Sequence, residues 1–198
     1  VEAVVGRYPI GFGHGRVVEG GVDEILEGIL LTRLVHDGLA DVDAFIAAHS
    51  GAPWFVSMVG FVAGLPFMFQ MVERERQLQV PKYLRPRTDT PKLTLGHGGC
   101  FGCIYSVRGA GGYQMFGVTP APIYDPQQNL AYLKEHMVFF RPGDIVQFKP
   151  MDREAYDVAV AEVEAGRFDL RIRPVEFSLD AFLADPIGYP KTLQEALA

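Results

Sequence analysis

Cationic side chains gather on a short proline-rich stretch, PKYLRPRTDTP, which spans residues 81–91. Lys82, Arg85 and Arg87 hang from it, and its three prolines predict a rigid, extended path. Such a segment can hold a carboxylate, a carbamate or a bicarbonate-like oxyanion, and arginine can do so with two parallel hydrogen bonds. The same charges also fit a solvated surface run, and the residues alone leave both interpretations open.

A glycine-rich stretch follows over residues 96–114, GHGGCFGCIYSVRGAGGYQ. It does not fit a phosphate-binding P-loop, which needs a Lys-Ser/Thr pair and a following helix, and the continuing strand pattern excludes a Rossmann turn. Glycines inside strands are typical of bulges and of close backbone approach. They would leave room for a small polar ligand, which Tyr105, Tyr113 and Gln114 could contact. Cross-strand packing is the alternative for these three side chains.

The same stretch contains a histidine and both cysteines of the chain. His97 stands between glycines and titrates near neutral pH, so it is either a candidate base or a hydrogen-bonded turn residue. Cys100 and Cys103 form a CxxC pair, which fits two packed thiols, a redox pair or half of a metal site. The histidines are scattered and no second ligand pair occurs, so we expect no metal.

A tight turn is predicted in GFVAGLPF, residues 60–67, because glycine and proline follow a strand pattern closely there. A turn of this kind can present backbone N–H groups to a ligand. A plain packed connection is the alternative interpretation.

Hydrophobic periodicity predicts the elements that must position these residues. Helical spacing of apolar residues over 22–34 and a shorter pattern over 41–49 indicate two helices. PWFVSMVGF indicates a buried strand, and from about residue 92 short apolar runs separated by Gly/Pro turns indicate further strands. A polar helix is predicted over 152–165 and a closing strand over 168–179.

The elements predict the fold class α+β, with a small lobe over residues 1–72 and a barrel-like lobe with a C-terminal extension over 73–198. The net charge of −6 argues against a nucleic-acid partner, which would need a basic surface. The apolar runs are short and interrupted, so we expect no membrane span. The sequence begins without a signal-peptide pattern and holds two cysteines, so we expect a cytoplasmic location.

Three of these segments resemble a known family. GFVAGLPF resembles the GFxPGxPY segment of the allophanate-hydrolase-subunit-1 proteins, the KipI-like proteins that include the B subunit of bacterial 5-oxoprolinase. KYLRPRTDTP is similar to the KYNPARTxTP segment of the urea carboxylase carboxyltransferase domain, with Leu84 in place of Asn. GHGGCFGCIYSVRGAGGYQMFGVTP resembles the family's GIGGxxxxIYxxxxPGGYQxxGRT segment. The resemblance covers roughly residues 40–185.

The resemblance implies a small N-terminal α/β lobe, a cyclophilin-like β-barrel lobe and half of a catalytic unit. The other half would be a subunit-2 (KipA-like) homologue. Biotin would arrive as carboxybiotin on a partner, from a biotin carboxylase or biotin carrier, and ATP would be used by a partner. The substrate-binding positions that the motifs carry over are Gly64, Pro66, Gly98, Gly99, Tyr105, Gly112, Tyr113 and Gln114.

The implied activity is that of a carboxyltransferase, which moves CO2 from carboxybiotin to the nitrogen of a urea- or amide-like small molecule. Lys82 and Arg87 would hold the carboxylate or carbonyl oxygen. A base must accept the substrate proton, and His97, which stands where the family usually has Ile or Val, is the candidate. Tyr105 and Gln114 would orient the amide. Two alternatives stay open: a subunit of an ATP-dependent lactam hydrolase of the 5-oxoprolinase type, and a KipI-like protein that inhibits a kinase.

Overall fold

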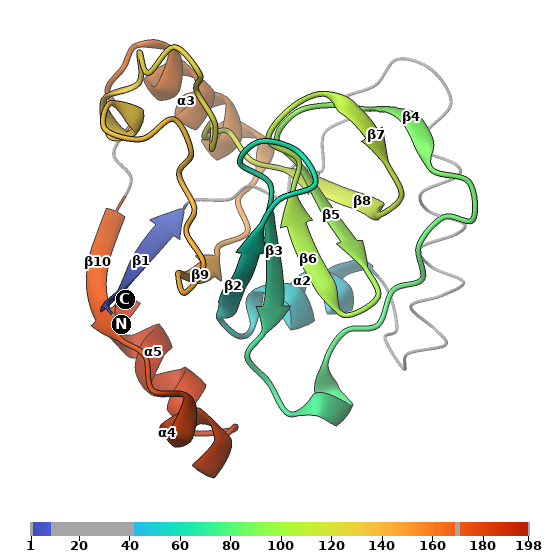
Figure 1. The fold of residues 1–198 in the computed structure, drawn as a ribbon, viewed down its shortest axis with the longest axis vertical. Coiled ribbons are helices and arrows are strands. Elements are labelled where there is room, and N and C mark those ends of the chain that lie inside the picture. Colours follow the sequence, from blue (N-terminus) through green and yellow to red (C-terminus); the bar gives the residue numbers. More distant parts are fainter. Residues whose placement is uncertain (1, 9–41, 169–170, 198) are drawn as a thin grey trace.

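The computed structural model describes residues 2–8, 42–168 and 171–197, and the helix predicted over 22–34 lies outside them. Its main feature is an eight-stranded sheet in the order β10–β1–β9–β2–β3–β6–β5–β8 (Figure 1). Neighbouring strands are antiparallel, apart from the parallel pair β1 and β9. The strands are β1 (Glu2–Tyr8), β2 (Trp54–Val59), β3 (Pro66–Gln70), β5 (Thr94–Gly98), β6 (Phe101–Ile104), β8 (Gln114–Val118), β9 (Ile145–Phe148) and β10 (Arg171–Glu176).

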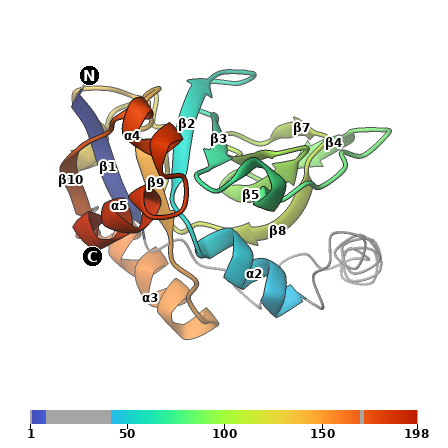
Figure 2. The ribbon, with the colours of Figure 1, turned by 90° about the horizontal axis from the view of Figure 1, so that it is seen from below.

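A second, two-stranded sheet lies beside the first and pairs β4 (Arg87–Thr90) with β7 (Gly109–Gly111). Figure 2 shows the strands from β3 to β8 curling over α2 (Val42–Ser50) as a half-barrel. The cationic stretch therefore leads into β4 of one sheet, while the glycine-rich stretch contributes to β5 and β6 of the other and supplies β7, the partner of β4.

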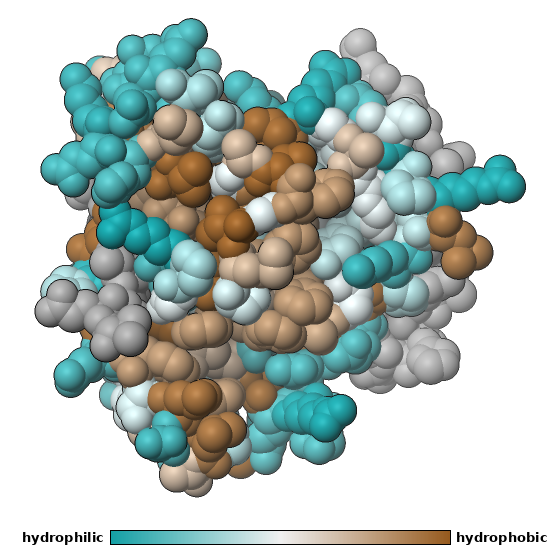
Figure 3. All heavy atoms as spheres, in the orientation of Figure 1, coloured by the Kyte–Doolittle hydropathy of each residue, from teal (hydrophilic) through white to brown (hydrophobic). Residues whose placement is uncertain are grey.

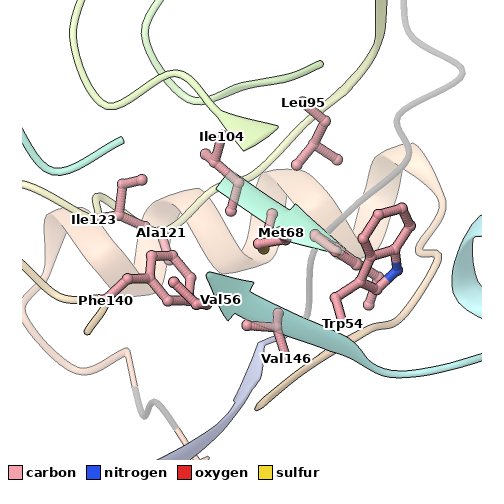
Figure 4. Packing of buried hydrophobic residues seen from close by; sticks show 10 residues of the cluster. Trp54, Val56, Met68, Leu95, Ile104, Ala121, Ile123, Phe140 and Val146 are labelled. Carbon is pink, nitrogen blue, oxygen red and sulfur yellow. The ribbon is translucent and has the colours of Figure 1, made fainter. Parts of the chain in front are cut away.

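The core fills the space between the curled sheet and the segments that cover it (Figure 4). On β2, alternate residues such as Trp54 and Val56 are buried, as the pleat of a half-buried strand requires. Trp54 also donates its indole N–H to the carbonyl of His49, which ties β2 to α2. The buried cluster contains Trp54, Val56, Met68, Leu95, Ile104, Ala121, Ile123, Phe140, Val146 and Phe148.

The other face of this sheet is also apolar, although it is less deeply buried. Figure 3 shows hydrophobic residues gathered over the middle of that face and hydrophilic residues around much of its edge. On β3, Phe67 and Phe69 alternate with the buried Met68 and are half-buried. The Phe69 and Phe101 ring centroids lie 4.3 Å apart across β3 and β6. The strands that carry the glycines are therefore packed on both faces.

The predicted helix over 152–165 is confirmed as α3 (Arg153–Glu164), and the one over 41–49 as α2. The Asp152 carboxylate accepts from the Ala155 N–H at 2.8 Å and caps the start of α3. Gly166 follows its end with φ +69°, a conformation that favours glycine. Two 3₁₀ turns, η1 (Arg74–Arg76) and η2 (Ala131–Leu133), lie in the connections.

Two further helices end the chain, α4 (Leu179–Ala184) and α5 (Tyr189–Leu197), and the sequence patterns do not anticipate them. Each is short, so each would be marginally stable as an isolated helix. Leu193 and Leu197, one helical turn apart, pack with Ile145 and Met71. Contact with the sheet, rather than local pattern, therefore stabilises α5.

The predicted α+β class is confirmed, with a curled, mostly antiparallel sheet. The division into lobes 1–72 and 73–198 stays a prediction. Strands β2 and β3 from the first interval belong to the same sheet as β5 and β6 from the second. No helix in the described part of the chain combines the length and apolar character needed to cross a membrane.

Candidate functional site

The cationic segment lies along the glycines of the next stretch. Val80 forms an isolated antiparallel bridge with Gly99, and the Tyr83 N–H donates to the Gly112 carbonyl at 2.9 Å. Arg87 then pairs with Gly111 as β4 meets β7. Two stretches that are separate in sequence therefore form one wall, with the cations on the first of them.

Arg87 is the most unusual side chain of this wall. Its guanidinium carbon lies 5.0 Å from the centroid of the Tyr83 ring, within the range of a cation–π contact. Its Nη2 donates to the Thr90 hydroxyl at a long 3.4 Å. Its Nε and Nη1 are buried and have no hydrogen-bond partner. Buried donors normally find partners, so these two make Arg87 the candidate for contact with an oxygen-bearing ligand.

Tyr105 lies next to this guanidinium. Burial, followed by the neighbouring Cys103 thiol, raises the pKa of Tyr105, while a hydrogen bond from the Tyr113 N–H, followed by the nearby Arg87, acts in the opposite direction. The phenol is therefore neutral at physiological pH and can donate a hydrogen bond. A Cβ added at Gly111 would stand 2.5 Å from both the Tyr105 hydroxyl and the Thr90 hydroxyl. Only glycine leaves room for this arrangement.

Lys82 lies at the other end of this group of side chains. Its Nζ lies 5.0 Å from the centroid of the Tyr113 ring, and its side chain is exposed. Tyr113 packs in one buried cluster with Tyr105, Cys103 and Leu65, and burial raises its pKa. The structure thus brings Lys82, Arg87, Tyr105 and Tyr113 to one region around a tyrosine pair.

The glycines of β5 make room for these tyrosines. A Cβ at Gly98 would overlap the Tyr113 ring, and one at Gly96 would stand 2.9 Å from the Tyr105 ring. The space beside Gly98, where the sequence predicts a substrate against the backbone, holds the Tyr113 ring. Gly99 differs, because it has φ +64° and open space where a side chain would be.

His97 lies on the opposite face of β5 and apart from the cations. It is fully buried, and its Nε2 donates to the Leu78 carbonyl at 3.1 Å. Its ring lies edge-on to Trp54 at 5.7 Å and to His49 at 6.2 Å. Burial lowers the pKa of His97 to about 4, so the ring is neutral at pH 7. The predicted role as a base stays a prediction, and this placement gives it no support.

Gln114 and the turn after β2 also have structural contacts. The Gln114 amide donates to the Pro81 carbonyl at 3.0 Å, so this donor is used within the chain. Gly64 has φ +76°, and a Cβ there would touch Tyr124 at 3.0 Å. Pro66 is buried at the start of β3. The turn is a packed connection that reaches the tyrosine pair through Leu65.

The two cysteines are free thiols, and burial raises the pKa of Cys103. Across residues 2–8, 42–168 and 171–197, no three His, Cys, Asp or Glu side chains gather closely enough to hold a metal ion. Sequence reasoning misses Tyr83, Thr90 and Gly111. Their signals are weak: Tyr83 adjoins Lys82, and Thr90 ends the RTDT run that begins at Arg87.

Comparison with known proteins places these residues in a family pattern. The family model of the carboxyltransferase domain, subdomain C and D, matches residues 30–133, which include every residue of the cluster. The B subunit of 5-oxoprolinase from Bacillus subtilis is 32% identical over 111 residues, covering 56% of this chain and 42% of that protein. The urea amidolyase of Lachancea kluyveri is 32% identical over 120 residues, covering 61% of this chain and 6% of that protein.

The fold is also similar to that of a urea amidolyase. The crystal structure of the K. lactis urea amidolyase superposes with a TM-score of 0.72 at 24% identity, over 99% of this chain and 12% of that one. The chain spans less than half the length of the curated relatives it matches.

Proposed function

The chain belongs to the carboxyltransferase domain family, subdomains C and D, and from this premise we propose that it forms one half of a biotin-dependent carboxyltransferase. The reaction would place a carboxyl group on the nitrogen of a urea- or amide-like small molecule. The observation that carries the proposal is the Arg87 guanidinium, which keeps two buried donors unpaired, while a second cation, Lys82, lies over the Tyr113 ring of the same region. The matched relatives are enzymes or enzyme subunits.

The cluster suits an oxyanion. Arg87 can donate from Nε and Nη1 to a carboxylate or to a carbonyl oxygen, and burial strengthens such charge-assisted bonds. The neutral Tyr105 phenol can donate to the same group, and Lys82 adds a mobile positive charge at the exposed end. Preorganised donors of this kind stabilise charge that develops on oxygen during transfer.

The residues present fit a carboxylated cofactor, because one cation, Arg87, has unpaired donors and a second cation, Lys82, lies over the Tyr113 ring of the same region. Biotin held by a partner would supply an activated carboxyl group. This chain would bind the carboxyl and carbonyl oxygens through Arg87 and Lys82 and orient them. The substrate nitrogen must lose a proton. His97 faces the core, so we assign the proton acceptor to the subunit-2 homologue.

A second candidate is ATP-dependent lactam opening. It is favoured by the matches to the B subunits of two 5-oxoprolinases, which extend over 42% and 48% of those proteins. The same donors would then polarise a lactam carbonyl or hold a phosphorylated oxygen. ATP would be used by the partner subunit in either case. The two free cysteines fit a reducing, cytoplasmic setting.

The test is reconstitution with a subunit-2 homologue and a biotinylated carrier with its carboxylase. Turnover of urea, simple amides and lactams is followed with ATP, with and without avidin, which sequesters biotin. We expect carboxylation of a urea- or amide-type nitrogen that avidin abolishes. Lactam opening that needs ATP and ignores avidin would overturn the carboxyltransferase and favour the second candidate.

A further inference from the structure

The cation-bearing residues 81–86 form neither strand nor helix, yet both ends are anchored. Before them, Val80 exchanges two backbone hydrogen bonds with Gly99, at 2.9 and 2.5 Å. After them, Arg87 enters β4 opposite Gly111. Between these anchors the chain runs over the barrel wall with five of its six residues exposed: Pro81, Lys82, Leu84, Arg85 and Pro86.

Within the part of the chain that the structure describes, two hydrogen bonds hold residues 81–86 against the sheet. One is the backbone bond from the Tyr83 N–H to Gly112, and the other is the bond from the Gln114 Nε2 to the Pro81 carbonyl at 3.0 Å. Pro81 and Pro86 have no N–H to donate, so the backbone can add little. Of the two hydrogen bonds, only the one from Gln114 is donated by a side chain.

Gln114 is built to hold this position. It is the first residue of β8, lies opposite His97 in the β5–β8 register and is 3% exposed. A buried strand residue has few rotamers, so its amide is fixed relative to the sheet. The Pro81 carbonyl is one peptide bond from Lys82, and the Tyr83 ring that follows covers Arg87.

We propose that Gln114 is a positioning residue, whose amide clamps Pro81 to the barrel and thereby sets where Lys82 and the Tyr83–Arg87 pair stand. It acts through the segment and does not bind substrate itself, in contrast to the role that the sequence motif implies. Its meaning for catalysis rests on the proposed function. The clamp itself lies within this chain and needs no partner.

Gln70 offers a matched control. It is 4% exposed on β3, and its Nε2 donates to the Ala48 carbonyl at 2.6 Å. Gln70→Met and Gln114→Met each remove one buried side-chain-to-backbone hydrogen bond at similar volume. A general loss of stability should therefore be similar in the two variants, whereas release of residues 81–86 should occur only in Gln114→Met.

The experiment is residue-resolved amide hydrogen exchange on the full chain, together with the rate of tryptic cleavage at the Lys82–Tyr83 bond. We expect Gln114→Met to speed exchange at the Tyr83 amide by about tenfold, the loss of one hydrogen bond, and to speed cleavage similarly. Gln70→Met should leave both rates near those of the wild type. Equal rates in the two variants would overturn the clamp.

Gln114→Glu keeps the test decisive should Gln114→Met not fold. The protonated carboxyl of this variant can donate to the Pro81 carbonyl, and the ionised one cannot. Protection of the Tyr83 amide, relative to the wild type at each pH, should fall as pH rises through the pKa of the new carboxyl. A constant ratio would overturn the proposal. Neither measurement needs a partner or a substrate, so the outcome is independent of the reaction the complex catalyses.

Discussion

The Arg87 guanidinium lies 5.0 Å from the centre of the Tyr83 ring, and two of its nitrogens are buried without a partner. An unsatisfied buried donor costs about 1–3 kcal/mol of stability. A fold keeps such a group where function requires it, and local rules of stability are broken mainly at functional sites. This relationship is the physical basis for proposing Arg87 as the centre of the candidate site.

Lys82 should contribute to ligand binding and little to folding. Its side chain is exposed and its contact with the Tyr113 ring is worth at most about 1 kcal/mol at such a site. We expect Lys82→Ala to lower kcat/KM of the assembled complex by about tenfold or more, with the urea unfolding midpoint nearly unchanged. Lys92→Ala, at another exposed position, is the control. Equal turnover of the two variants would remove Lys82 from the site.

Gly111 should be intolerant of a side chain. A Cβ there would meet the Thr90 and Tyr105 hydroxyls, each at 2.5 Å, so Gly111→Ala should destabilise the fold by about 1–3 kcal/mol through overpacking. Gly109 belongs to the same strand and has nothing within 4 Å of an added Cβ. Gly109→Ala should therefore change the unfolding free energy by less than about 0.5 kcal/mol. Chemical denaturation of both variants checks this; similar losses would contradict the packing described for Tyr105.

Acid should weaken the fold through His97. Its pKa is about 4 in the folded protein and 6.5 in an unfolded chain, so between these values only the unfolded state takes up the proton. The contribution of His97 to the free energy of unfolding is fully present above pH 6.5 and falls by about 2 kcal/mol between that pH and pH 5. Burial, followed by the nearby His97, also lowers the pKa of His49, which adds to the effect.

Urea unfolding at pH 7 and pH 5 measures this loss. Burial raises the pKa of Asp144 to about 6, so protonation of this carboxyl stabilises the fold as pH falls and opposes the effect of His97. The pH dependence of the wild type alone therefore combines both effects. Comparison with His97→Gln isolates the histidine, since the variant has no titrating group at this position. The variant should lose about 2 kcal/mol less than the wild type. An identical pH dependence would mean that the pKa of His97 is the same in the folded and unfolded states.

Local patterns predict the elements with strong periodicity. Trp54 and Val56 alternate with less buried residues as a half-buried strand requires, and α3 has an aspartate at its start and a glycine past its end. Such signals lie within a few residues and need no knowledge of the rest of the chain. The parallel pairing of β1 with β9 joins distant segments, and no local signal indicates it.

The site is predictable only in part for the same reason. The cations are visible as Lys82 and Arg87, because their spacing on a proline-rich path is a local feature. The role of the glycines is not visible in the sequence. Gly98 accommodates the Tyr113 ring, and Gln114 reaches back to Pro81, contacts that exist only once the sheet has formed. Motif position alone suggests substrate contacts for all of them.

The most direct test of the central claim is Arg87→Met, measured for both stability and turnover. Methionine keeps much of the length of the side chain and removes the unpaired donors, so the unfolding free energy should stay level or rise by about 1 kcal/mol. Turnover of the assembled complex should fall by about a hundredfold. Arg153→Met, which removes an exposed ion pair with Asp157, is the control and should leave turnover within about twofold of the wild type. A destabilised Arg87→Met protein with normal turnover per folded molecule would contradict the account.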